Sequence, residues 1–146
     1  MLYTNYGVAA FQMGNEDAAE KMFEYADEIY QAFDEFSEYP IALAYLAYFD
    51  AKKQEMASAR QRIRKALALC DRVLSPGGKG VTIYMMWQIR ADFGDRQDIG
   101  ELADLWPESE EEHCEWCLSY LHQIEWREET QQIEQALQKL QQGAPA

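Results

Sequence analysis

Apolar residues recur every three or four positions along most of the chain, which is the spacing of one face of an α-helix. After Asn15 the expected buried face consists of Ala19, Met22, Phe23, Ala26, Ile29, Tyr30 and Phe33. The same spacing predicts further helices over residues 3–13, 41–53, 55–74, 81–93 and 99–106, and a long final helical segment after 109 that breaks near Arg127. The pattern therefore predicts an all-α protein.

Residues that start or stop helices separate these segments. Gly14 is suited to end the first helix in a left-handed conformation, and Asn15 to cap the next one. Gly94–Asp95 repeats this arrangement of a glycine followed by a cap. Ser75–Gly80, with the sequence SPGGKG, is the strongest loop signal in the chain. Two further helix starts are predicted at Pro40, and at Ser109 with Glu112 as a capping box.

The chain matches itself at a shift of 40 residues, as from Tyr3 to Leu43. At this shift large apolar residues stand opposite large ones, and small residues opposite small ones. The matched pairs are Tyr3 with Leu43, Tyr6 with Leu46, Gly7 with Ala47, Ala19 with Ala59, Phe23 with Ile63, Ala26 with Ala66 and Ile29 with Leu69. A period in this range, built from helix–turn–helix units, is typical of a helical solenoid.

Gly7 stands inside a helix and costs it about 1 kcal/mol relative to alanine. Together with Ala19 and Ala26 it leaves space that lets the helices of one hairpin, and the next hairpin, approach closely. We expect Phe23 and the Tyr3–Tyr6 pair to fill the space around these small residues. Tighter packing between helices then offsets the local cost of the glycine.

The first hairpin resembles the tetratricopeptide repeat (TPR), whose pattern it follows in order and spacing at Tyr3, Tyr6–Gly7, Gly14, Ala19, Phe23 and Ala26. The second hairpin matches at Leu43, Leu46–Ala47, Ala59, Ile63 and Ala66. It has Gln54 where the family has a turn glycine. In the third, Gly94–Asp95 suits the turn, but Trp87, Ile99 and Trp106 stand where small residues belong. The period of 40 exceeds the usual 34, so we expect the second helices to be elongated.

The resemblance implies a single domain of antiparallel helical hairpins, stacked as a short TPR-like solenoid. The predicted divisions are repeat 1 at about 1–39, repeat 2 at about 40–74, a degenerate repeat 3 at about 80–107, and a C-terminal capping helix or helical pair at about 108–142. A polar outer face is what a terminal repeat needs, and the acidic last segment suits that role.

The resemblance also implies a concave groove that binds peptides through the first helix of each hairpin. The expected groove residues are Asn5, Val8, Gln12, Tyr45, Tyr48, Lys52, Tyr84, Met85 and Gln88. The family's carboxylate clamp is not expected, because Thr4, Val8 and Met85 replace most of its polar residues. The alternative is that the tyrosines simply pack between repeats, since aromatic stripes at helical spacing usually belong to a core.

Charge changes this picture in two ways. The formal net charge is −13, which makes nucleic acid an unlikely partner because phosphate is repelled. The charge is uneven, with −8 over residues 1–40, +5 over 41–80 and −10 over 81–146. The basic segment, with Arg60, Arg62, Arg64, Lys65 and Arg72, either pairs with its acidic neighbours or offers a docking patch to an acidic partner.

HCEWC, from His113 to Cys117, is the motif that most resembles a chemical site. Zinc commonly takes four ligands from two separated pairs, and no second pair is present. We expect His113 to point away from Cys114, and we expect Cys114 and Cys117 to be buried thiols on an apolar face. A metal or redox role for the two cysteines is the alternative, but no cofactor, catalytic set or phosphate loop is predicted.

The sequence therefore predicts a non-enzymatic adaptor or scaffold that binds a protein or peptide in an uncharged, aromatic groove. Alternatives are a small acidic secretion-type chaperone, and the sensor part of a transcription or signalling protein. No apolar run reaches the roughly 20 residues of a membrane span, and no secretory signal is evident. Three cysteines within helical patterns favour free thiols in the cytoplasm. The N-terminal hairpin is expected to have an uncovered outer side that could form a homodimer.

Overall fold

The computed structural model describes residues 2–33, 37–73 and 76–143 of the 146-residue chain. Over these ranges the chain forms α-helices and two short 3₁₀ helices, and no strand, so the prediction of an all-α protein is confirmed. The elements are α1 (Leu2–Gln12), α2 (Glu16–Phe33), α3 (Tyr39–Lys52), α4 (Met56–Val73), α5 (Pro76–Phe93), η1 (Gln97–Glu101), η2 (Ala103–Leu105), α6 (Glu110–Ile124) and α7 (Arg127–Gln142).

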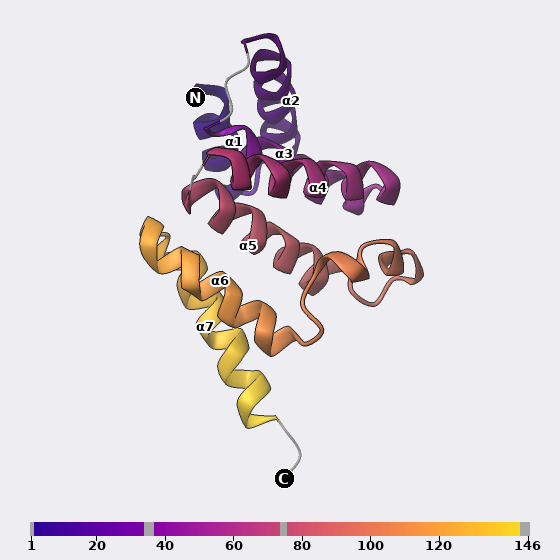
Figure 1. Cartoon of the computed structure of the whole chain (residues 1–146), viewed down its shortest axis with the longest axis vertical. Helices are drawn as coiled ribbons and strands as arrows, with labels where there is room; N and C mark the ends of the chain where they lie inside the picture. The colour runs from indigo at the N-terminus through magenta and orange to yellow at the C-terminus, as the bar shows by residue number, and fades with distance from the viewer. Residues whose placement is uncertain (1, 34–36, 74–75, 144–146) are drawn as a thin grey trace.

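The helices follow one another along the long axis of the molecule, from α1 and α2 at one end to α7 at the other (Figure 1). Each helix packs against the next one in the chain, and α3 also packs against α5. The core draws side chains from α1 through α7, and Leu102 from the 3₁₀ segment joins it. None of the described helices is long and apolar enough to cross a membrane.

The first two turns within hairpins have the same backbone geometry. Gly14 is left-handed, with φ +85°, and the side chain of Asn15 accepts a hydrogen bond from the Ala18 amide at 3.3 Å, so both expectations are confirmed. Gln54, which the repeat sets opposite Gly14, is also left-handed, with φ 66°. Gln54 therefore takes the same left-handed conformation as Gly14, at a cost in backbone strain.

Close packing around Gly7 explains why α1 contains a glycine. A Cβ atom at Gly7 would lie 2.8 Å from two ring carbons of Phe23 on α2. Phe23 is fully buried, and its ring stacks on that of Tyr45 with the centroids 4.6 Å apart. Ala19 and Ala26 are buried as well. The expectation that small residues let the helices approach closely is confirmed.

Residues that match between the first two hairpins in sequence differ in how far they are buried. Leu43, Leu46 and Leu69 are buried, whereas their counterparts Tyr3, Tyr6 and Ile29 are 37%, 57% and 37% exposed. The expected burial of Ile29, and the expectation that Tyr3 and Tyr6 fill interior space, are therefore wrong. The physical reason is position: the α3–α4 hairpin contacts α2 on one side and α5 on the other, while one side of α1–α2 has no neighbour within the described chain.

The predicted loop at Ser75–Gly80 is wrong for its described residues, because α5 begins at Pro76. Proline suits the first turn of a helix, and the glycines that follow serve packing. A Cβ atom at Gly80 would lie 3.1 Å from Cβ of Tyr120 and 3.3 Å from Cδ1 of Ile124, both on α6. Glycine here lets α5 and α6 approach closely.

The predicted helix over residues 99–106 is also wrong, since this stretch forms η1 and η2 instead. Arg96 precedes η1 without a side-chain cap, so the second glycine-then-cap arrangement is not completed. The fully buried Leu102 anchors the segment, and Arg60 on α4 pairs with Asp104 at 2.5 Å. As a result α6, and not the 99–106 segment, packs as the partner helix of α5.

The last two helices form as the sequence predicts. The Ser109 hydroxyl accepts a hydrogen bond from the Glu112 amide at 3.0 Å and caps α6. The predicted break near Arg127 is present: Glu125 is left-handed, with φ 59°, and α7 begins at Arg127. The C-terminal segment is thus a helical pair.

Gly7→Ala is expected to destabilise the protein, because the new methyl group meets a ring that is held on its other face by Tyr45. Overpacking of about 1–3 kcal/mol outweighs the gain in helix propensity of about 1 kcal/mol. Urea unfolding measures the change. In a Phe23→Leu background the same substitution should cost clearly less, and an equal cost in both backgrounds would contradict the explanation.

Gln54→Gly is expected to stabilise the protein by about 0.5–1 kcal/mol, because glycine adopts the left-handed conformation without strain and position 54 is exposed. The midpoint of urea unfolding measures the gain. Gln54→Ala, which keeps the strain, is the control and should change the midpoint little. A loss of stability in Gln54→Gly would reject the strain at this turn.

Candidate functional site

Four of the nine expected groove residues line one pocket. Gln12 comes from α1, Tyr45 from α3, and Tyr84 and Gln88 from α5. Four further lining residues were not predicted from the sequence: Phe11, Glu128, Glu129 and Gln132. The pocket has a volume of about 280 Å³ and lies between α1, α3, α5 and α7.

Aromatic rings form the inner wall of the pocket. The rings of Phe11 and Tyr45 meet edge to face, with centroids 5.1 Å apart, and Tyr45 stacks on Phe23 from the other direction. Tyr45 is only 2% exposed. The alternative interpretation, that the tyrosines pack between helices, therefore describes Tyr45 correctly, although this residue also lines the pocket.

A series of hydrogen bonds connects α3 to α7 beside the pocket. Tyr48 donates to Asp92 at 2.6 Å, and the Gln88 amide donates to the other oxygen of Asp92 at 3.0 Å. The Gln132 amide donates to the Gln88 carbonyl oxygen at 3.3 Å, and the Tyr84 hydroxyl donates to the Gln132 carbonyl oxygen at 2.6 Å. The network fixes the position of α7 relative to α5.

The pocket has an acidic rim at the start of α7. Glu128 and Glu129 lie in the first turn of that helix, and the Gln12 amide reaches Glu129 at 3.5 Å. Burial, with a smaller contribution from the charge of Glu129, raises the pKa of Tyr84. Its hydroxyl therefore stays protonated at neutral pH and keeps its donor role. Glu128 and Glu129 line the pocket without any Lys or Arg beside them, so the pocket is acidic and not uncharged as expected.

The other expected groove residues lie outside the pocket. Met85 is fully buried, because it is turned about 100° around α5 from Tyr84. The expectation that Met85 lines the groove is therefore wrong. Tyr48 is buried, and its hydroxyl donates a hydrogen bond to Asp92. Lys52 forms an ion pair with Glu16 at 2.9 Å. Val8 is half-buried against the core, and Asn5 is exposed.

The pocket residues that were not predicted differ in the sequence signal that could have indicated them. Phe11 stands one position before Gln12, and a helix turns by about 100° per residue, so Phe11 was not among the residues expected on the groove side. Glu128, Glu129 and Gln132 belong to a segment whose spacing predicts only an amphipathic helix. Their place in the pocket depends on how α7 folds back beside α5, which no local pattern encodes.

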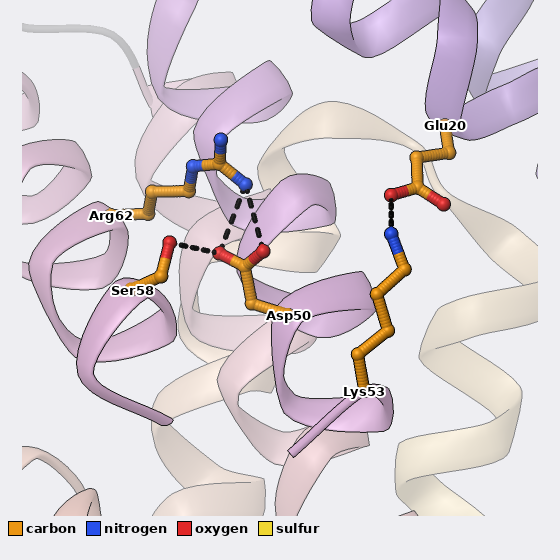
Figure 2. A network of polar contacts seen from close by, with 5 residues as sticks. All are labelled: Glu20, Asp50, Lys53, Ser58 and Arg62. Carbon is orange, nitrogen blue, oxygen red and sulfur yellow. Dashed lines mark hydrogen bonds and ion pairs between the residues drawn. The ribbon is translucent and has the colours of Figure 1, made fainter. Parts of the chain in front are cut away.

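A second polar cluster is buried between α3 and α4. Asp50 accepts hydrogen bonds from Ser58 at 2.8 Å and from one guanidinium nitrogen of Arg62 at 2.9 and 3.0 Å (Figure 2). Burial raises the pKa of Asp50, while Ser58 and Arg62 oppose that shift. Figure 2 also shows Lys53 pointing at Glu20 on α2, so polar contacts connect α3 to both α4 and α2.

Several residues of the basic segment pair within the chain. Lys52 and Lys53 bind Glu16 and Glu20 on α2, and Arg60 binds Asp104 on η2. Of the residues named in the basic segment, Arg60 and Arg62 pair within the chain, Arg60 with Asp104 and Arg62 with Asp50. Lys65 donates to the Tyr39 hydroxyl at 3.0 Å.

His113 and Cys117, four positions apart on α6, both point toward α5. Nε2 of His113 lies 3.2 Å from the carbonyl oxygen of Ile83, and Sγ of Cys117 lies 3.7 Å from the same atom. Cys114 and Cys117 are fully buried, as expected. Burial raises the pKa of both thiols, which keeps them protonated and unreactive.

The described residues contain no group of three or more His, Cys, Asp or Glu side chains placed to hold a metal ion. His113 acts as a donor to Ile83, since a carbonyl oxygen can only accept, and this places its proton on Nε2. Its Nδ1 atom is buried without a partner. The motif thus ties α6 to α5 through one carbonyl.

Comparison of the chain with protein-family models, with curated proteins and with solved structures finds no match.

The stability of the protein should fall between about pH 6.5 and pH 4, because burial lowers the pKa of His113 from 6.5 to about 4. In this window the unfolded chain binds a proton that the folded chain does not, so acid favours unfolding by about 3 kcal/mol. Urea unfolding at several pH values measures this slope. His113→Gln should reduce the slope, and His122→Gln, at the exposed histidine, should leave it unchanged. Equal slopes in all three proteins would contradict the prediction.

Proposed function

We propose that the protein is a non-enzymatic interaction module that binds a peptide segment of another protein in the pocket between α1, α3, α5 and α7. The observation that carries the proposal is that Gln12, Tyr45, Tyr84 and Gln88, expected in a groove from their repeat positions, line one pocket. These residues come from three helices and are far apart in the sequence. A pocket of about 280 Å³ has room for one or two side chains of a bound peptide.

We further propose that the hairpins are TPR-like units, with α1–α2, α3–α4 and α5–α6 as three successive repeats and α7 as the cap. In support, Gly14 and Gln54 share one left-handed turn geometry at positions that the repeat makes equivalent. The small residues Ala59 and Ala66 are buried like their counterparts in the first hairpin. The packing of α3 against α5 fits the stacking of first helices in such arrays.

The lining of the pocket favours a segment with a basic side chain. Glu128 and Glu129 stand at the rim, no cation lines the pocket, and the net charge of the chain is −13. The aromatic walls of Tyr45, Tyr84 and Phe11 offer ring faces or edges to the stem of a Lys or Arg side chain. The amides of Gln12, Gln88 and Gln132, which donate to Glu129, Asp92 and Gln88, can exchange these bonds for bonds to a peptide backbone.

Selection from a random peptide display library against the full chain tests the proposal. We expect selected peptides to be enriched in Lys or Arg and to bind more weakly as salt concentration rises. Gln132→Trp fills the pocket and should weaken binding about tenfold or more, or ~1.4 kcal/mol. Gln138→Trp, on an exposed part of the same helix, is the matched control and should leave the affinity unchanged.

Helicity by circular dichroism is measured for both variants, so that a loss of binding is not confused with a loss of fold. Equal affinity of the selected peptides for the wild type and for Gln132→Trp would reject the pocket as the binding site. Selected peptides without basic residues, whose affinity is insensitive to salt, would reject the acidic rim as the source of specificity.

A further inference from the structure

The first turn and a half of α7, from Arg127 to Gln132, supplies the side of the pocket that comes from that helix. Glu128, Glu129 and Gln132 line the pocket, and all six residues of the stretch are polar. None of these six residues is buried, whereas the next residue, Ile133, is fully buried. We call residues 127–132 the wall segment.

The wall segment begins without a side-chain cap. Trp126 precedes α7, and its side chain makes no capping hydrogen bond, whereas Ser109 caps α6. The hydroxyl and the amide of Thr130 both donate to the Trp126 carbonyl oxygen, at 2.6 and 2.9 Å. Sharing of this kind weakens a helix slightly, and an uncapped first turn is the part of a helix that opens most readily.

Side-chain hydrogen bonds join the wall segment to α1 and α5. The Tyr84 hydroxyl donates to the Gln132 carbonyl oxygen at 2.6 Å, and the Gln132 amide donates to Gln88 at 3.3 Å. The Gln12 amide reaches Glu129 at 3.5 Å. Gln12 and Gln132 are exposed, so water can replace their partners, and the net contribution of such bonds to stability is small. Stretches with few buried contacts and exposed hydrogen bonds open locally while the core stays folded.

The closed pocket is small for the ligand that we assign to it. A volume of about 280 Å³ has room for one or two side chains, whereas a peptide segment also brings its backbone. Sites that enclose most of a ligand commonly measure about 300–1,000 Å³. Tyr45 and Tyr84 are 2% and 7% exposed, so the inner wall belongs to the core and cannot move without disturbing it. The wall segment is the side of the pocket that can move at least cost.

We propose that the wall segment is a gate, which unwinds to admit a peptide and keeps Glu128 and Glu129 beside the basic side chain that enters. This inference rests on the proposed function and adds the regulation of that site. Ile133 is buried and Trp126 packs against the core, so the opening is confined to the polar residues between them. The closed gate lowers the affinity of the pocket in proportion to the fraction of molecules that are open.

Gln131→Gly tests the gate, because Gln131 is exposed, lies within the wall segment and does not line the pocket. Glycine weakens the helix locally and should raise the open fraction about threefold. We expect the amides of residues 130–133 to exchange about threefold faster, as measured by NMR on the full chain. A peptide selected from the library should bind about threefold more tightly. Gln138→Gly, at an exposed position of the same helix beyond Ile133, is the matched control and should change neither quantity.

An affinity that Gln131→Gly leaves unchanged or weakens would overturn the gate, since a fixed wall gains nothing from being loosened. Slower exchange of residues 130–133 in the peptide complex would overturn it too, because the gate is unwound in that state. Either result leaves the proposed function standing, since a peptide still binds in the pocket. A library that yields no binding peptide would instead reject the proposed function, and the gate with it.

Discussion

The burial of helix α3 on every side is the constraint on which the rest of the structure depends. Each residue from Ala42 to Ala51 is buried, so this helix has no solvent face and needs neighbours all around it. Helices α2, α4 and α5 supply most of that cover, and Phe11 of α1 adds edge-to-face contacts with Tyr45, Tyr48 and Phe49. The two hairpins and α5 are thereby fixed relative to one another.

Two features make this burial favourable in free energy. Small residues at Gly7, Ala19 and Ala26 let the first hairpin approach until Phe23 stacks on Tyr45. The one buried carboxylate of α3, Asp50, is compensated by Ser58 and Arg62, since an unpaired buried charge would cost several kcal/mol. Lys52 and Lys53 at the end of α3 bind α2 without entering the core.

The same arrangement gives the first hairpin two different surfaces. On one side of α1, Phe11 and Gln12 line the pocket, whose acidic rim comes from α7. On another side, Leu2, Tyr3 and Tyr6 are exposed together with Tyr25 and Ile29 of α2. The pocket is polar and acidic at its rim, whereas these exposed side chains are aliphatic or aromatic. The acidic rim is why we assign a peptide segment with a basic side chain to the pocket.

The sequence by itself determined the elements that depend on local chemistry. Its periodicity predicted the all-α class, Gly14 and Asn15 predicted the first turn, and Ser109 predicted the start of α6. These succeed because turn geometry and capping depend on residues within a few positions of one another. Gln12, Tyr45, Tyr84 and Gln88, which the resemblance to the tetratricopeptide repeat predicted in one groove, line one pocket.

Only the tertiary structure decided what each surface meets. The glycines of the predicted loop at Ser75–Gly80 turned out to serve the approach of α6 at Gly80, and the same composition would suit a loop if no helix lay there. Tyr6 and Leu46 have equivalent sequence positions but opposite burial, because only the second hairpin has neighbours on both sides. Glu128 and Glu129 reach the pocket through the path of α7 and not through any local pattern. Burial and pocket lining depend on contacts between residues far apart in the chain, and no local sequence pattern indicates which distant residues come into contact.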